Sequence, residues 1–198
     1  FKKKIIFQNR PSFEAQLAAI SDDIAYNSHD LEDGLKAGLF KVKDLQEIDI
    51  IKLFIKKYKS KMITDELIKR IISRELINYL VIDVIKNTKN NLKKNNIKSL
   101  NSIYNSNINV VNFSSEVKVL DAQIKNFLKR KMYYSPEVLK RTNKGKKIIA
   151  LLFKKIIKSP NKIKEIKINK KQNIYRQVSD FIAGMTDRYA LRLYKKLT

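Results

Sequence analysis

Residues 12–33, SFEAQLAAISDDIAYNSHDLED, contain the pattern that most limits how this chain can fold. Their apolar side chains recur at helical spacing, so at ~100° per residue they lie within a band of roughly 60° on one side of a helix. The band consists of Phe13, Leu17, Ile20, Ile24 and Leu31. Because such a band is stable only when it is buried, we expect this side of residues 12–33 to face a core.

The opposite side of the same helix carries a different pattern. Asp22, Tyr26 and Asp30 recur every four residues, so they climb the helix as a ladder. A solvent face would normally carry Lys and Glu, but the residues beside this ladder are Ala15, Ala18, Ala19 and Ala25. The pattern suggests that something packs closely against the ladder and that the ladder lines a site. The alternative is a simply solvated face, and helical spacing does not separate the two.

Helical spacing continues along the chain, and no strand pattern is convincing beyond the first residues. The predicted helices are 44–57, 64–90, 114–132, 136–158 and 172–197. Residues 91–112, rich in Asn and Ser, are expected to form a loop or a poorly ordered connection, and 161–171 a solvated Lys-rich connector. We therefore expect an all-α fold, a helical bundle.

Three glycines refine this expectation. Gly34 and Gly38 predict that the first helix stops or kinks near residue 33. Gly184 lies inside the predicted helix 172–197, where it costs ~1 kcal/mol relative to Ala and indicates a close approach of another helix.

The composition favours a soluble, cytoplasmic protein. A chain of 198 residues can bury a core and suits one domain or two small ones. It contains no Cys, which excludes disulfides and thiolate metal sites and suits a reducing compartment. Its longest apolar runs, such as 76–85, fall well short of the ~20 residues that cross a bilayer, so no membrane partner is expected.

The chain is strongly basic. Lys and Arg outnumber Asp and Glu by 43 to 19, a formal net charge of +24, which makes polyanions the natural partners. The Lys residues are accompanied by abundant Asn and Ile, a bias that an AT-rich genome also produces. The charge is therefore weak support for any specific ligand.

Three stretches, in order, resemble the HD-domain deoxynucleoside triphosphate triphosphohydrolases, the deoxyguanosine triphosphatase-like family. They are ISDDIAYNSHDLEDGLKAGLF at 20–40, MYYSPEVLKRTNKGKKIIALLFKKIIKSP at 132–160 and VSDFIAGMTDRYALRLYKKL at 178–197. The resemblance covers nearly all of the chain and matches the C-terminal portion of the family.

The resemblance implies a role for each residue of the ladder. Asp22 corresponds to the last metal ligand, Tyr26 to a triphosphate contact and Asp30 to a second substrate contact. Since two anions repel, Asp30 suits a sugar hydroxyl better than a phosphate. Arg70 matches a basic position of the family and is a candidate for a further substrate contact. The alternative is that Arg70 forms an ion pair with Glu66 on the solvent-exposed surface. No catalytic residue beyond the metal ligand is implied.

The remaining polar residues near these motifs are given structural roles. His29 lies off the centre of the ladder and is interpreted as a helix-end residue, and Asp23 as a group behind the site or on the surface. Asp187 and Arg188 lie in the family-like AGMTDRYA and are interpreted as mainly structural.

The activity implied by the resemblance is metal-dependent hydrolysis of deoxynucleoside triphosphates, such as dGTP, to deoxynucleoside and triphosphate. Residues 1–92 are then the C-terminal part of the HD phosphohydrolase domain, and 113–198 a helical phosphohydrolase-associated domain. Such a site needs a His and a His-Asp pair besides the final Asp, but the chain has a single His. We expect a missing N-terminal half to carry the other ligands, and this chain alone to be inactive.

The same resemblance implies a divalent metal, with Mg or Mn favoured by the hard carboxylate oxygen and Fe, Co or Zn admitted by His co-ligands. A homo-oligomer is also expected. Two other classes of function stay open: a basic helical module that binds nucleic acid, and a non-catalytic accessory module that only packs against a partner. The basic clusters that suggest the former are Lys56, Lys57, Lys59 and Lys61, and Lys125, Lys129, Arg130 and Lys131.

Overall fold

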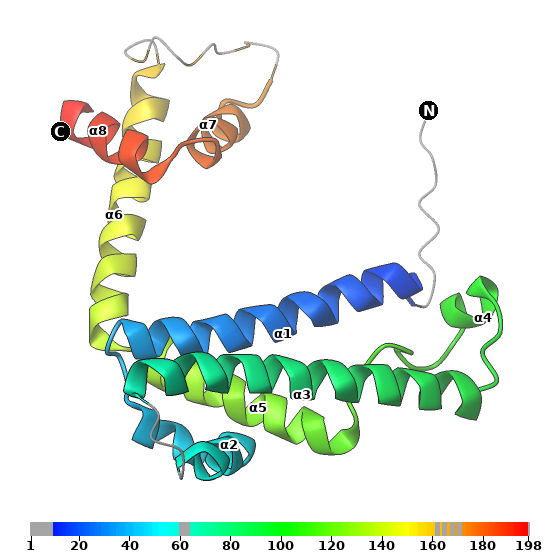
Figure 1. Ribbon diagram of the computed structural model, residues 1–198. Helices are drawn as coiled ribbons and strands as arrows, with labels where there is room; N and C mark the ends of the chain where they lie inside the picture. Colours follow the sequence, from blue (N-terminus) through cyan, green and yellow to red (C-terminus); the bar gives the residue numbers. More distant parts are fainter. Residues whose placement is uncertain are drawn as a thin grey trace. The chain divides into compact units, whose positions relative to one another are not determined.

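The structure is a computed structural model, and it describes residues 10–59, 64–160, 163, 166, 169 and 172–197. Over these residues the regular secondary structure is helical, which confirms the predicted all-α fold (Figure 1). The contacts divide the chain into two compact units, Phe1–Ser135 and Pro136–Thr198. The division predicted from the sequence, 1–92 and 113–198, concerns family domains and not compact units, and it stays a prediction.

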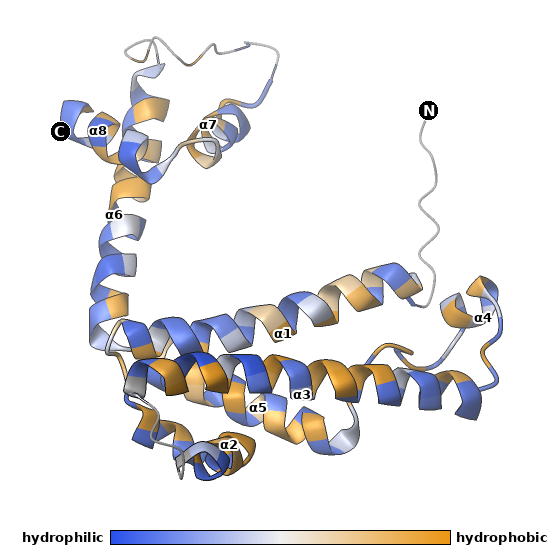
Figure 2. Ribbon diagram, in the orientation of Figure 1, coloured by the Kyte–Doolittle hydropathy of each residue, from blue (hydrophilic) through white to orange (hydrophobic). Residues whose placement is uncertain are grey.

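The first unit is built on two long helices. Its elements are α1 (Phe13–Lys36), the 3-10 helix η1 (Val42–Glu47), α2 (Asp49–Lys59), α3 (Asp65–Lys94), α4 (Leu100–Tyr104), α5 (Ser115–Leu128) and the π-helical turn η2 (Lys129–Tyr133). Helix α1 lies along α3 and also packs against α5 (Figure 1). The apolar sides of these helices meet in one core, whose most buried residues include Leu31, Ile51, Leu76, Leu80, Ile124 and Leu128 (Figure 2).

The ends of α1 follow from local signals. The Ser12 hydroxyl accepts a hydrogen bond from the Ala15 N–H at 3.2 Å, the expected N-cap. The helix continues through Gly34 and ends only at Lys36, where Gly38 adopts a φ of +71°. Gly34 is required for another reason, because the buried ring of Phe40 occupies the space that a Cβ would fill.

Two details of the first unit differ from the expectation. Leu17 belongs to the predicted apolar band but is 44% exposed. The first buried residue of that band is Ile20. The helix expected over 44–57 is two elements, because Ile48 has an extended backbone between η1 and α2. Ile48 is buried, and the break turns it into the core.

Residues 91–112 are better ordered than the sequence suggested. Helix α3 runs on to Lys94 and ends where Asn96 takes a positive φ of 49°, and α4 follows. Ile97, Ile103 and Val110 form a small buried cluster beside this segment. The Asn side chains that suggested disorder instead bind the backbone, since the amide of Asn91 donates to the Val110 carbonyl at 2.9 Å.

The second unit consists of α6 (Pro136–Lys158), α7 (Ile174–Ala183) and α8 (Asp187–Leu197), with both short helices packed on α6. Its core contains Leu152, Ile156, Val178 and Leu193. The single helix expected over 172–197 is wrong, because Gly184 caps α7. The close approach expected at Gly184 is also wrong, since a Cβ there would meet nothing nearer than 3.6 Å. The predicted connector 161–171 lies largely outside the described residues.

Among the residues described, no helix combines the length and the apolar character needed to cross a membrane.

Candidate functional site

The ladder of α1 is exposed at one end and half-buried at the other. Asp22 and Tyr26 are exposed, with Tyr26 at 59%, whereas Asp30 is partly covered. The cause is helical geometry, because each step of four residues turns the side chain by ~40°. By Asp30 the ladder has turned toward the segment of α5 and η2.

Asp30 is held from that segment by a tyrosine 103 residues further along the chain. The hydroxyl of Tyr133, the last residue of η2, donates a hydrogen bond to Oδ2 of Asp30. Burial, the acceptor Asp30 and the neighbouring phenol of Tyr26 together raise the pKa of Tyr133. The phenol therefore stays protonated and remains a donor. Sequence reasoning missed Tyr133, although it lies at the start of the second family-like stretch.

A polar seam beside the ladder joins α1 to α5. Nζ of Lys125 lies 3.0 Å from Asp23 and 2.8 Å from Asp121, and the amide of Asn27 donates to Asp121 at 3.0 Å. Burial of Lys125 opposes its charge, but the hydrogen bonds to Asp121 and Asp23 outweigh burial and raise its pKa. The seam was not predicted. Its signal in the sequence is Asp23, Asn27 and Asp30, polar residues that fall on one flank of an apolar band.

Asp22 is exposed and does not form a metal site together with other described residues. It makes no hydrogen bond or ion pair with any residue that the structure describes, and its neighbours Ala18 and Ala19 are exposed. No group of three or more His, Cys, Asp or Glu residues gathers in the described ranges. A single carboxylate does not hold a divalent metal alone, so the metal-ligand role expected for Asp22 stays a prediction from the resemblance.

Arg70, on α3, is exposed and lies near the end of α1 beyond the ladder. Its charge opposes protonation of Lys36, whose pKa is nevertheless raised, chiefly by the hydrogen bond to Glu32. The alternative ion pair between Arg70 and Glu66 is not formed within the described residues, because Glu66 pairs with Lys69 at 3.3 Å. Arg70 forms no hydrogen bond or ion pair with Asp22, Tyr26 or Asp30, all of which the structure describes.

His29 lies within α1, well before its end at Lys36, so it is not the helix-end residue that was expected. It is exposed, and its charge helps to lower the pKa of Glu32, after the larger effect of the hydrogen bond from Lys36 at 2.7 Å. In the second unit, Asp187 lies in the first turn of α8 and lines a cavity of about 330 Å³ with Arg141 and Lys144.

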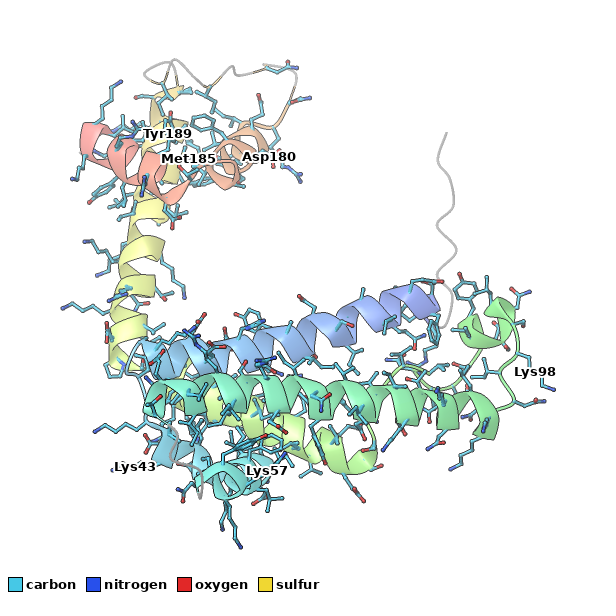
Figure 3. The ribbon with its side chains drawn as sticks, viewed as in Figure 1. Lys43, Lys57, Lys98, Asp180, Met185 and Tyr189 are labelled. Atoms are coloured by element: carbon cyan, nitrogen blue, oxygen red, sulfur yellow. The ribbon has the colours of Figure 1, made fainter. Side chains whose placement is uncertain are left out.

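The basic residues of the first unit are spread over it and partly neutralised. Figure 3 shows Lys43 and Lys57 in the region of η1 and α2, and Lys98 beyond the end of α3. In the clusters that suggested nucleic-acid binding, Lys57 pairs with Glu75, Lys125 with Asp23 and Asp121, and Arg130 with Glu47 at 2.6 Å.

Comparison with known proteins agrees with these motifs. Residues 111–196 match the family described as the phosphohydrolase-associated domain. A protein of Pelagibacter ubique is 47% identical over 199 residues, 98% of this chain and 53% of the relative. The resemblance predicted from the three motifs is confirmed. Both this relative and one from Leptospira interrogans, 36% identical over 96% of this chain and 52% of its own length, are named deoxyguanosinetriphosphate triphosphohydrolase-like protein.

A third protein of that name, from Rickettsia typhi, is 35% identical over 94% of this chain and 50% of its own length. The chain therefore spans about half the length of the curated relatives it matches. The match to the phosphohydrolase-associated domain begins at residue 111, so it covers α5 and η2 as well as α6 to α8. Tyr133, Asp121 and Lys125 lie within the matched residues, whereas the ladder on α1 precedes them. The seam and the Tyr133–Asp30 bond thus join the matched region to the ladder helix.

Proposed function

We propose that this chain takes part in the metal-dependent hydrolysis of deoxynucleoside triphosphates to deoxynucleoside and triphosphate, as the C-terminal part of a longer protein. The names of the relatives and the match to the phosphohydrolase-associated domain support the reaction class. The observation that carries the proposal is the ladder on α1. It consists of Asp22, which no described residue pairs with, the exposed phenol of Tyr26 and the carboxylate of Asp30, which Tyr133 holds in place.

Each residue of the ladder has a role that suits its surroundings. Tyr26 is exposed, and its hydroxyl would donate a hydrogen bond to a phosphate oxygen of the substrate. Asp30 already accepts a hydrogen bond from Tyr133, so its carboxylate would accept a second one from the sugar hydroxyl. A direct contact between Asp30 and a phosphate would be repulsive. Arg70 is exposed on α3 and is proposed as a further cation for the triphosphate.

Asp22 would be one ligand of the divalent metal, with the remaining ligands supplied by polypeptide outside this chain. Mg or Mn fits a carboxylate ligand, and His ligands from elsewhere would also admit Fe, Co or Zn. When bound, such a metal lowers the pKa of a coordinated water and polarises a phosphoryl oxygen. The small exposed side chains of Ala18 and Ala19 leave room for a partner surface close to Asp22.

The test uses the longer protein that contains this chain, assayed for release of triphosphate from dGTP with Mg or Mn. Asp22→Asn should lower kcat by at least about 100-fold, because a neutral amide is a weaker ligand for a divalent metal than a carboxylate. Asp33→Asn is the matched control, since Asp33 is an exposed aspartate near the end of the same helix. Equal activity of the two variants would refute the role of Asp22.

Nucleic-acid binding is not proposed, because the structure favours it less than the sequence did. Three of the cations in its two clusters are engaged by carboxylates, and Lys61 lies outside the described residues.

A further inference from the structure

We propose that the second unit carries a docking groove on α6, where α7 and α8 meet it, and that this groove binds an acidic, amphipathic helix of a partner protein. The groove consists of two neighbouring hollows, one between α6 and α8 and one between α6 and α7. No residue of the ladder on α1 lines it, so this inference goes beyond the proposed function and does not depend on it.

The groove is apolar and open to solvent. The hollow between α6 and α8 has a volume of about 330 Å³, and the hollow between α6 and α7 about 650 Å³. Ile149 lines both hollows, so they adjoin on the side of α6 that α7 and α8 flank (Figure 1). Ile149 is 42% exposed and Leu191, in the first hollow, is 43% exposed. Covering such apolar side chains with a partner is favourable.

Gly145 opens the first hollow. The buried stripe of α6 contains Ile148, Leu152 and Ile156, and Gly145 continues it three residues earlier. A Cβ on Gly145 would meet no atom of the described residues within 4 Å. Packing within the chain therefore does not require glycine here, although glycine inside a helix costs ~1 kcal/mol relative to Ala. The missing side chain leaves room on the core stripe for a side chain of a partner.

The charge around the groove selects the partner. Lys144 lines the first hollow and Lys146 the second, and neither forms an ion pair with a residue that the structure describes. Both are exposed. Residues 136–198 contain 18 Lys and Arg and only 4 Asp and Glu. Because like charges repel, a second copy of this unit is disfavoured as the occupant, and a segment with acidic residues beside its apolar stripe is favoured.

The shape of the groove favours a helix over other polyanions. An amphipathic helix places apolar side chains at positions i, i+3 or i+4, and i+7 into a groove, and two adjoining hollows suit such anchors. Nucleic acid would present phosphates and sugars, which leave the apolar linings uncovered. An anionic bilayer takes up protruding apolar side chains, whereas these linings are recessed.

The test measures binding of a synthetic peptide to the longer protein that contains this chain, by fluorescence anisotropy. The probe is a labelled helix of about 18 residues, or five turns, with Leu along one face and Glu elsewhere. One reference peptide has the same composition with its Leu residues scattered, and another has Lys in place of Glu. Wild type should bind the probe at least about 10-fold more tightly than either reference.

Gly145→Leu should fill the first hollow and weaken binding of the probe by at least about 10-fold, since the anchor of the partner is then excluded. The open space at Gly145 allows the variant to fold, which circular dichroism checks. Asn143→Leu is the matched control, because Asn143 is exposed on the same helix and lines neither hollow. It should change the affinity by less than about twofold.

A pair of charge variants keeps the test decisive if Gly145→Leu folds poorly. Lys144→Glu combined with Lys146→Glu should weaken binding of the probe by at least about 10-fold at about 0.15 M salt. Lys147→Glu combined with Lys154→Glu makes the same change in net charge at exposed positions of α6 outside both linings. This second pair should weaken binding by less than about threefold.

Several outcomes would overturn the inference. They are equal binding of the three peptides, binding of none, equal loss in the two charge pairs, and unchanged binding in a folded Gly145→Leu. A DNA duplex or an anionic vesicle that binds wild type and is released by Gly145→Leu would assign the groove to another class of partner. If no peptide binds and Gly145→Leu alters the assembly mass, the protein itself covers the groove. Because the assay contains neither nucleotide nor metal, all of these outcomes leave the proposed function standing.

Discussion

Asn27 of α1 is 4% exposed and donates its amide hydrogen bond to Asp121 of α5 over 3.0 Å. The two residues are 94 positions apart, and Asp121 also binds Lys125, which reaches Asp23. A buried polar contact of this kind ties the ladder helix to the region that matches the phosphohydrolase-associated domain.

Loss of this bond should destabilise the chain. Asn27→Ala leaves an oxygen of Asp121 without its donor, and we expect a cost of ~1–3 kcal/mol in the free energy of unfolding. Urea unfolding of the 198-residue chain, followed by circular dichroism, measures it. Asn126→Ala, at an exposed position of α5, is the control and should change stability by less than ~0.5 kcal/mol.

Gly34 and Gly145 make a pair in which the same substitution has opposite effects. Gly34→Ala places a methyl group where the buried ring of Phe40 lies, so it should cost ~1–3 kcal/mol. Gly145→Ala, in α6 with open space around it, should stabilise the chain by ~0.5–1 kcal/mol through helix propensity. Thermal unfolding midpoints that shift in the same direction would contradict the predicted contact at Gly34.

Tyr133 should ionise later than an ordinary tyrosine. Burial and the bond to Asp30 disfavour the phenolate in the folded chain, while the unfolded chain has an ordinary pKa of about 10. The raised pKa therefore contributes stability that is fully present below about pH 10 and is lost as the pH rises through the folded value.

An alkaline titration followed by tyrosinate absorbance checks this directly. The difference between wild type and Tyr133→Phe isolates the phenol of Tyr133 from the other tyrosines. Asp30→Asn should lower the pKa of that phenol, because it replaces the charged acceptor with a neutral one. An unchanged titration in Asp30→Asn would show that the bond does not form in solution.

The 198-residue chain alone should release no triphosphate from dGTP, with or without added Mg or Mn. The reason is that the described residues place only Asp22, and no cluster of ligands, at the candidate metal position. Mixing with the relatives' remaining portion, or expression as one longer protein, should restore turnover. Activity of the purified chain by itself would contradict the proposed division of the metal site.

The starts of three helices were predicted well because their causes are local. Ser12, Thr64 and Ser114 each accept a hydrogen bond from a backbone N–H three residues later, as the sequence implied. The breaks at Ile48 and Gly184 were missed, because apolar spacing continues across both positions. At Ile48, burial of the side chain in the core accompanies the extended backbone that interrupts the helix.

For the candidate site, the ladder could be identified from spacing and resemblance, since Asp22, Tyr26 and Asp30 lie on one helix. Their different exposure could not be identified, because it depends on where α5 and η2 cross α1. The Arg70 assignment remains a prediction from resemblance, and the structure adds only that its alternative partner Glu66 is taken by Lys69.

By itself, the sequence determined the all-α class, the beginnings of the helices capped by Ser12, Thr64 and Ser114, the face of α1 that carries the ladder and the family that the chain resembles. These properties depend on side-chain spacing and on bonds within a few residues. Only the tertiary structure decided that Tyr133 meets Asp30 and that Asn27 meets Asp121. Such contacts join residues about a hundred positions apart, and they exist because burial of a shared apolar core sets the register between the helices that carry them.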